Sequence, residues 1–251
     1  MEDYTLLIDL YKNTPRQGPG SNEETEKAIN LAKIDRTEPL QIADIGCGTG
    51  ASTLVLARLL NAQITAVDFL QDFLDVLKDS AQKAGLSDKI KPLCCSMDDL
   101  PFQNEQLDVI WSEGAIYNIG FEAGVKAWKR YLKPGGLLVV SEITWLTHQR
   151  PETTQAYWES AYPEIDVCSS KISVLEKQGY SPLGYFALPE DCWLDHYYRP
   201  LQAGFEDFLT RNSNSADAQA IVDAERQEIA LYEAHKTHYS YGVYIAKKLA
   251  P

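Results

Sequence analysis

Hydrophobic positions along this chain follow two kinds of spacing, which alternate over most of its length. Short apolar runs predict buried strands, at residues 40–45, 63–67, 89–94, 107–112 and 136–143. Between them, apolar residues recur every three or four positions and predict amphipathic helices, at 52–60, 70–84 and 121–131. This alternation is typical of an α/β protein with a doubly wound, mainly parallel sheet. Its ligand site is expected at the carboxyl ends of the strands.

Two predicted helices precede the first strand. Apolar residues within 2–12 predict a short helix, and the turn residues of 14–20 predict a loop after it. Ser21 or Asn22 is placed to cap a second helix that runs to about Lys33, with Glu24 positioned to close a capping box. We therefore expect residues 1–36 to form an N-terminal helical lid and 37–251 to form the main domain.

The pattern is less regular after residue 142. Helices are predicted at 151–160, 166–179 and 215–236, and the aromatic-rich stretch 191–213 is expected to be helical in part. Two further strands are predicted at 183–188 and 239–247, which brings the sheet to seven. We expect lid-like insertions at about 145–165 and 190–236.

The first predicted strand ends in a loop with three glycines, Gly46, Gly48 and Gly50. Glycine has no Cβ, so such a loop lets the backbone come close to a ligand. The next strand ends at Asp68, which lies 18 residues after Gly50. An acidic residue about 20 residues after a glycine-rich turn is placed to bind the two hydroxyls of a ribose. The glycine loop and Asp68 together predict a cofactor that contains a nucleoside.

Two classes of cofactor fit this loop. Gly46, Gly48 and Ala51 satisfy the G-x-G-x-x-G/A pattern of dinucleotide-binding domains, which would indicate a nicotinamide cofactor. Asp44 favours a different ligand, because its carboxylate would repel a pyrophosphate and suit a cationic amino-acid group. S-adenosylmethionine has such a group, an ammonium close to a sulfonium. The residues alone leave both classes open.

Four segments in order resemble the class I S-adenosylmethionine-dependent methyltransferases. Asp44–Gly50 is similar to motif I of that family, and Ala66–Phe69 to the acidic end of its second strand. The stretch 96–110 resembles the loop after the third strand with the strand that follows, and Tyr131–Gly136 the turn before the fifth. The resemblance covers about residues 40–145. It is nearest to the small-molecule enzymes of the ubiquinone and menaquinone biosynthesis type.

The resemblance implies a Rossmann-like sheet of seven strands with an antiparallel last strand, and S-adenosylmethionine as cofactor. It implies that Asp44 lies beneath the methionine amino group and that Asp68 holds the ribose. Met97 and Phe69 would contact adenine. The remaining cofactor-binding positions that it implies are Gly46, Cys47, Gly48, Gly50, Ser96, Asp98 and Glu113.

The sequence departs from the family in two places. Ser96 stands where the family often has an aspartate that accepts a hydrogen bond from adenine, so either Ser96 or Asp98 would supply the acceptor. The last two strands of the family form a hairpin with a short turn, whereas about 50 residues separate them here. We interpret this insertion as a lid or an oligomer contact, which makes a homodimer plausible.

Two residues are candidates for catalysis. Glu113 follows the fourth strand, where it would orient the nucleophile, accept its proton or contact the methionine end of the cofactor. His196 is a second candidate base, within an aromatic-rich stretch. Aromatic residues that could line an apolar substrate pocket, of which we expect two or three to touch substrate, are Tyr117, Trp145, Trp158, Tyr162, Trp193, Tyr197 and Tyr198.

Charge and composition narrow the partners. The formal net charge is −13 and no cluster of basic residues occurs, which argues against nucleic acid and favours a small-molecule substrate. No apolar run approaches the roughly 18 residues of a membrane span. An acidic N-terminus and five cysteines without paired spacing favour a cytoplasmic protein. His235 and His238 lack an acidic or cysteine partner at ligand spacing, so no metal is expected.

The sequence thus predicts an enzyme that transfers a methyl group from S-adenosylmethionine to a small, partly apolar molecule. Two alternatives stay open at this point. One is an oxidoreductase of the NAD type on a similar sheet, and the other is a non-catalytic module that binds a nucleoside cofactor. The acceptor atom is not identified.

Overall fold

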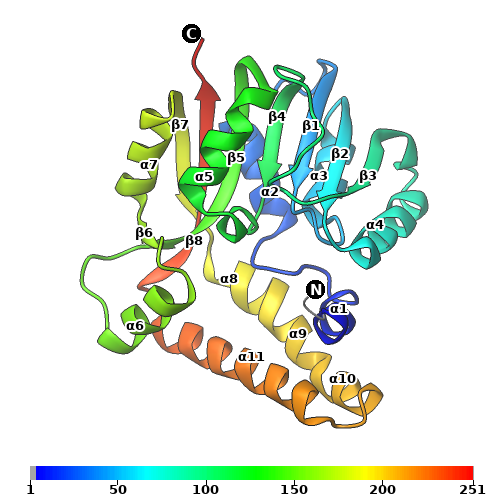
Figure 1. Ribbon diagram of the computed structural model, residues 1–251, viewed down its shortest axis with the longest axis vertical. Helices are drawn as coiled ribbons and strands as arrows, with labels where there is room; N and C mark the ends of the chain where they lie inside the picture. The colour runs from blue at the N-terminus through cyan, green and yellow to red at the C-terminus, as the bar shows by residue number, and fades with distance from the viewer. Residues whose placement is uncertain (1–3, 251) are drawn as a thin grey trace.

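The computed structural model describes residues 4–250 and contains one large sheet with helices on both faces (Figure 1). Its strands lie in the order β3-β2-β1-β4-β5-β8-β7. Their bounds are β1 (Leu40–Ile45), β2 (Ala62–Asp68), β3 (Ile90–Cys94), β4 (Leu107–Ser112), β5 (Leu132–Trp145), β7 (Tyr180–Ala187) and β8 (Tyr239–Lys248). The first five are parallel, and β8 runs antiparallel to both β5 and β7. The predicted fold class is confirmed.

Three of the described strands differ clearly from the prediction, of which β7 begins three residues before its predicted start. A two-residue strand, β6 (Asp166–Val167), pairs with the end of β5 and was not predicted, because two residues are too few to show a pattern. Strand β5 begins four residues before its predicted start, and its register against β4 shifts between Leu107 and Val109. Gly135, in this part of β5, has a φ of 79°, a conformation that glycine adopts readily.

Helices cover both faces of the sheet. One face carries α2 (Asn22–Leu31), α3 (Ala51–Leu59) and α4 (Gln71–Lys83), and the other carries α5 (Phe121–Trp128) and α7 (Cys168–Lys177). Successive side chains of a strand point to opposite faces. In β1, accordingly, Ile42 belongs to the core on the first face and Ala43 and Ile45 to the core on the second.

The start of α2 follows its sequence signal. The Ser21 hydroxyl accepts a hydrogen bond from the Glu24 N–H at 3.1 Å, so Ser21 is the predicted cap. The Glu24 carboxylate accepts a hydrogen bond from Lys27 at 2.8 Å. The helix packs against α3 and β8 on the face of the sheet.

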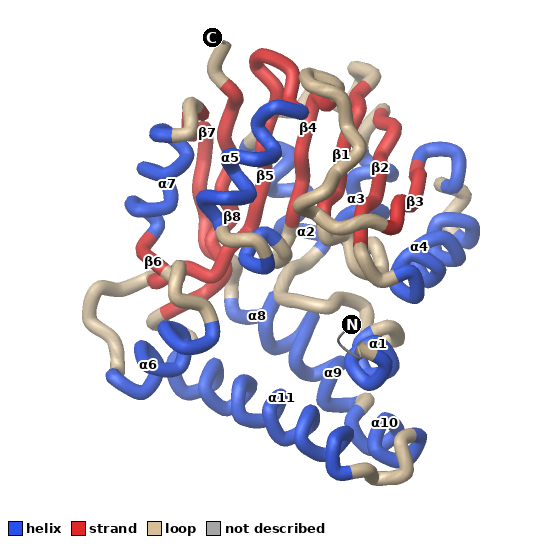
Figure 2. The backbone as a smooth tube through the Cα atoms, in the orientation of Figure 1, coloured by secondary structure: helices blue, strands red, loops and turns tan. Residues whose placement is uncertain are grey.

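A second group of helices lies beyond the carboxyl ends of the parallel strands, and we call it the helical layer (Figures 1 and 2). Its members are α1 (Thr5–Tyr11), α6 (Glu152–Ala161), α8 (Glu190–Trp193), a π-helical turn η4 (Leu194–Tyr198), α9 (Arg199–Ala203), α10 (Phe205–Arg211) and α11 (Ala216–His235). Short 3₁₀ turns occur elsewhere, at η1 (Ser87–Lys89), η2 (Ile116–Asn118) and η3 (Lys129–Tyr131).

The predicted insertions at 145–165 and 190–236 contain α6 and α8–α11 of this layer. Within the predicted N-terminal lid, α1 belongs to the layer and α2 to the sheet face; residues 2 and 3 of the first predicted helix lie outside the described residues. The division into a lid and a main domain stays a prediction. No helix between residues 4 and 250 is long and apolar enough to cross a membrane.

Candidate functional site

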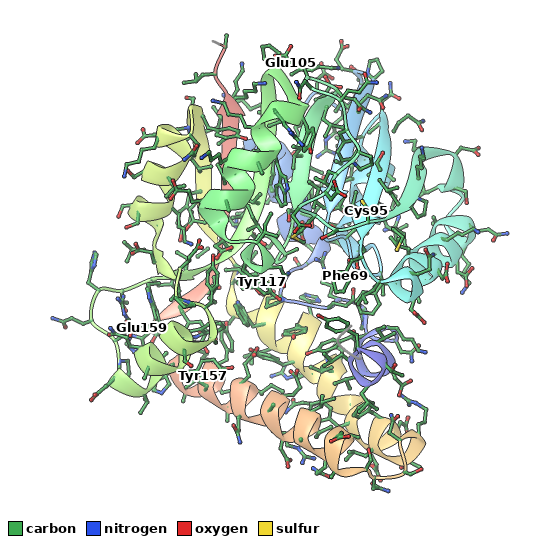
Figure 3. The ribbon with its side chains drawn as sticks, viewed as in Figure 1. Phe69, Cys95, Glu105, Tyr117, Tyr157 and Glu159 are labelled. Carbon is green, nitrogen blue, oxygen red and sulfur yellow. The ribbon has the colours of Figure 1, made fainter. Side chains whose placement is uncertain are left out.

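A cavity of about 750 Å³ separates the carboxyl ends of the strands from the helical layer. Its sheet side is formed by the glycine loop after β1 and by the segments that follow β2, β3 and β4. Its other walls come from α1, α6, α8, η4 and α11. Figure 3 labels Phe69 and Tyr117 near the sheet edge and Tyr157 on α6 across from them. The cavity therefore lies where a doubly wound sheet binds ligands.

Most of the residues predicted to bind the cofactor meet at this cavity. The structure places nine of them in its wall: Gly46, Cys47, Gly48, Asp68, Phe69, Ser96, Met97, Asp98 and Glu113. Asp44 and Gly50 lie behind that wall, in the same loop and strand. His196 lies elsewhere.

Asp68 is fixed at the end of β2 by backbone donors. One carboxylate oxygen accepts a hydrogen bond from Gly48 N–H at 2.9 Å, and the other from Leu70 N–H at 3.0 Å. The side chain is 8% exposed, and its burial raises the pKa of the carboxyl group. These bonds set the orientation of a carboxylate that faces the cavity. They also tie the glycine loop to β2.

Asp44 is fully buried beneath the glycine loop. One of its oxygens accepts hydrogen bonds from Ser52 Oγ at 2.9 Å and Thr53 Oγ1 at 2.6 Å, both in the first turn of α3. The other oxygen has no hydrogen-bond partner among the described residues. Burial raises the pKa of Asp44 to about 7, and the negative charge of Glu113 adds to the effect. The carboxylate braces the loop against α3 and keeps one acceptor free.

Two glycines of the loop are required for different reasons. Gly48 has a φ of 55° and lines the cavity, and a Cβ there would collide with Gln17 Oε1. Gly50 has a φ of 88° and precedes α3, and a Cβ there would collide with the side chain of Leu77 in α4. Gly48 thus lets backbone come close to the cavity, whereas Gly50 leaves room for the Leu77 side chain of α4.

The segments after β2 and β3 form one end of the cavity. Phe69 is 51% exposed and packs edge-on against Tyr4, with ring centroids 5.5 Å apart. The Ser96 hydroxyl donates a hydrogen bond to Asp98 Oδ1, which leaves the second oxygen of Asp98 free of that bond. Met97 is held through its carbonyl, which accepts a hydrogen bond from Trp128 Nε1 at 2.9 Å. An exposed aromatic face and free acceptors suit a planar heterocycle.

Glu113 is held by three donors. Its Oε1 accepts hydrogen bonds from Thr25 Oγ1 at 2.8 Å and Trp111 Nε1 at 2.9 Å. Its Oε2 forms an ion pair with the buried guanidinium of Arg16 at 3.0 Å. The carboxylate therefore joins the end of β4 to α2 and to the loop between α1 and α2.

That loop, residues 12–20, crosses the cavity beside the glycines, and we call it the strap. Besides Arg16, it contributes Gln17, whose Oε1 accepts hydrogen bonds from Thr49 N–H at 2.8 Å and Thr49 Oγ1 at 3.0 Å. Sequence reasoning predicted a loop at residues 14–20, and Gly18 and Pro19 of that loop line the cavity. It missed Arg16 and Gln17, for which the only signal was two polar residues in a loop rich in glycine and proline.

Aromatic residues, many of them from the helical layer, line the rest of the cavity. Of the aromatic residues singled out from the sequence, those that line it are Tyr117, Trp158, Tyr162, Trp193 and Tyr197. Trp145 and Tyr198 are buried without lining it. The aromatic lining residues that were not foreseen are Tyr4, Tyr11, Phe73, Tyr157 and Tyr241.

His196 is exposed on η4 and does not line the cavity. Its neighbour Tyr197 points inward and is buried. One step along a helix turns the side chain by about 100°. This geometry gives no support to the predicted role of His196 as a base.

Two carboxylates of α11 were also missed. Glu228 lines the cavity and accepts hydrogen bonds from the hydroxyls of Tyr198 at 2.9 Å and Tyr157 at 3.4 Å. Glu225, one turn earlier, accepts one from the Tyr11 hydroxyl at 2.6 Å, and its second oxygen is buried with no partner between residues 4 and 250. Burial raises the pKa of Glu225 to about 7. The sequence shows them only as acidic residues of a polar helix.

Comparison with known proteins finds a family match over part of the chain. Residues 42–136 match a family described as "Methyltransferase domain". The chain is 32% identical over 120 residues to a demethylmenaquinone methyltransferase of Bacteroides fragilis, which is 47% of this chain and 48% of that protein. It is 27% identical over 112 residues to the methyltransferase GfsG of Streptomyces halstedii, 44% of this chain and 40% of that protein. The chain thus spans less than half the length of these two curated relatives.

Solved structures extend the likeness to the whole fold. A SAM-dependent methyltransferase from Thiobacillus denitrificans, crystallised with S-adenosylhomocysteine, superposes with a TM-score of 0.85 at 18% identity. The match covers 98% of this chain and 99% of that one. The protein therefore has the fold of the SAM-dependent methyltransferases. The family match within that fold is confined to residues 42–136.

Proposed function

We propose that the protein is a methyltransferase that uses S-adenosylmethionine to methylate a small, partly apolar molecule. The observation that carries the proposal is the position of Asp68, fixed beside Gly48 in the wall of a cavity whose far end is aromatic. The family match and a neighbour crystallised with S-adenosylhomocysteine support this choice of cofactor. They give no support to the two alternatives, a nicotinamide oxidoreductase and a non-catalytic module.

The residues present fit this cofactor from end to end. In our proposal Asp68 binds the two ribose hydroxyls, Phe69 and Met97 contact adenine, and the backbone of 46–48 passes close to the ligand. Ser96 already donates to Asp98, so Asp98 is the better acceptor for the adenine amino group.

The amino-acid end has two fitting charges. Arg16 is the one cation among the described residues of the cavity wall, and it suits the methionine carboxylate. Asp44, with one unpartnered oxygen, supplies negative charge beneath the ammonium group without lining the cavity itself. Glu113 positions Arg16 through their ion pair.

When bound, the cofactor supplies an electrophilic methyl group on its sulfonium. The protein must then hold the acceptor in line with the breaking bond, and such positioning is worth several kcal/mol of the barrier. In our proposal the aromatic wall orients the acceptor. The strap and the helical layer keep water out of the cavity. A homodimer and a cytoplasmic location stay predictions of the sequence.

Calorimetry with S-adenosylhomocysteine tests the proposal. The native protein should bind it with a Kd in the micromolar range, about −8 kcal/mol. Asp68→Ala should weaken binding roughly tenfold or more, because a carboxylate that accepts two hydroxyl hydrogen bonds is lost. Asp72→Ala, an exposed site in the first turn of α4, is the matched control and should bind as the native protein does.

Two outcomes would overturn the proposal. Binding of NAD with no affinity for S-adenosylhomocysteine would restore the oxidoreductase alternative. Tight binding of S-adenosylhomocysteine without transfer of labelled methyl to any component of a metabolite extract would favour a non-catalytic module.

A further inference from the structure

We infer that the molecule methylated by this protein carries a positively charged nitrogen, and that Glu228 and the aromatic rings around it recognise that charge. The inference rests on the proposed function and names the class of its substrate. It concerns the end of the cavity formed by the helical layer.

The charges that line the cavity are unbalanced. Its described wall contains the carboxylates of Asp68, Asp98, Glu113 and Glu228, and the single cation Arg16. Arg16 is already paired with Glu113 at 3.0 Å. Glu228 therefore has no cation beside it in the wall. An anionic substrate, such as a phosphate or a carboxylate, would be repelled at this end.

The hydrogen bonds of Glu228 come from neutral groups. Tyr198 and Tyr157 donate to its two oxygens and fix its orientation, but they leave its charge uncompensated. Glu225, one turn earlier on α11, does not line the cavity but adds a second carboxylate nearby, with a buried oxygen that has no hydrogen-bond partner among the described residues. Burial of a carboxylate without a cation costs several kcal/mol. A cationic ligand would offset that cost, whereas a neutral one would leave it in place.

Aromatic rings supply the second half of the recognition. Tyr157 and Trp158 of α6 and Trp193, Tyr197 and Tyr241 line this end of the cavity. The electron-rich face of such a ring attracts an ammonium group. The rings are held by their neighbours: Trp193 stacks on Tyr232 with centroids 4.5 Å apart, and Tyr197 packs on Tyr198 at 4.9 Å. Rigid rings around a carboxylate are a site suited to ammonium ions.

A pair of isosteric probes tests the charge directly. Choline has a fixed positive charge, and dimethylbutanol, in which carbon replaces its nitrogen, has the same shape without charge. Choline is already fully methylated at nitrogen, so the readout is binding, measured with saturating S-adenosylhomocysteine by calorimetry or ligand-observed NMR. We expect choline to bind the native protein roughly tenfold or more tightly than dimethylbutanol.

Two variants assign the preference to this site. Glu228→Gln keeps the shape of the side chain and should abolish most of the preference for choline. Glu233→Gln, an exposed position on the same helix, is the matched control and should keep it. Tyr157→Phe removes only a hydroxyl and serves as a milder second variant in case Glu228→Gln does not fold. It should also reduce the preference for choline.

The outcomes separate this inference from the proposed function. The inference would be overturned if choline and dimethylbutanol bind equally, or if Glu228→Gln keeps the full preference for choline. In either case the proposed function still stands as long as the protein binds S-adenosylhomocysteine. Loss of S-adenosylhomocysteine binding in the native protein would instead refute the function itself.

Discussion

At the scale of single residues, two nearby glycines in one loop have different structural roles. Gly48 lines the cavity and Gly50 packs against Leu77, although the sequence presents both as parts of one glycine pattern. A pattern of glycines shows where backbone freedom is needed. It does not show whether a ligand or a side chain requires it.

The packing role of Gly50 can be tested by measuring how its substitution changes stability. Gly50→Ala places a Cβ against Leu77 at a positive φ, so we expect it to lower the free energy of unfolding by about 2–4 kcal/mol. Gly85→Ala, at a φ of 68° with nothing within 4 Å of the added Cβ, has the backbone cost alone, about 1 kcal/mol. Urea denaturation of both variants measures the difference. Equal losses would show that Leu77 moves aside freely.

The candidate site could be predicted from sequence only where it is local to a motif. Asp68 and Phe69 follow β2 directly, and Glu113 follows β4, so strand order alone brings them to the same edge. Arg16 and Glu228 reach the cavity through the packing of distant helices, which no local pattern encodes. His196 lies outside the cavity wall, because the sequence does not show which side chain of the irregular helix η4 faces inward.

At the scale of elements, polar contacts hold the strap beside the cavity, among them the Gln17–Thr49 hydrogen bonds and the Arg16–Glu113 ion pair. Gln17→Ala removes its acceptor for Thr49, while the Arg16–Glu113 pair remains. We expect faster hydrogen exchange and faster proteolysis within residues 12–20, because a loop held by fewer contacts opens more often. Asn13→Ala, at an exposed position of the same loop, is the control. Unchanged exchange in Gln17→Ala would show that the arginine pair alone holds the strap.

Elements with a long periodic pattern were the ones predicted most closely. Strands β1, β2 and β4 and helices α3 and α4 match their expected bounds within two residues. The irregular start of β5, around Pro134 and Gly135, and the two-residue β6 depend on pairing with other strands. Pairing of this kind is set by the whole sheet rather than by the segment.

At the scale of the whole molecule, buried carboxylates govern how stability changes with pH. Burial raises the pKa of Asp44, Glu142 and Glu225 to about 7, above their ordinary values near 4. The folded state therefore binds more protons than the unfolded state between about pH 4 and 7, and unfolding free energy falls as pH rises through that range.

We expect the melting temperature to be lower at about pH 8 than at about pH 5.5, in the absence of ligand. Asp44→Asn should flatten the dependence, because one of the three groups no longer ionises. Asp72→Asn, an exposed carboxylate, should not change it. Differential scanning calorimetry across this range measures the effect. A melting temperature that rises with pH would contradict the assignment.

The helices of residues 190–236 leave and rejoin the sheet at neighbouring points. Strands β7 and β8 lie side by side, and Leu188 N–H donates to the carbonyl of Tyr241 at 2.8 Å, just where the chain departs. Such an arrangement makes the segment exchangeable, since a different insertion could be joined to the same two strand ends. Under the proposed function, a change of this segment would alter acceptor preference while the half of the molecule around the glycine loop stays the same.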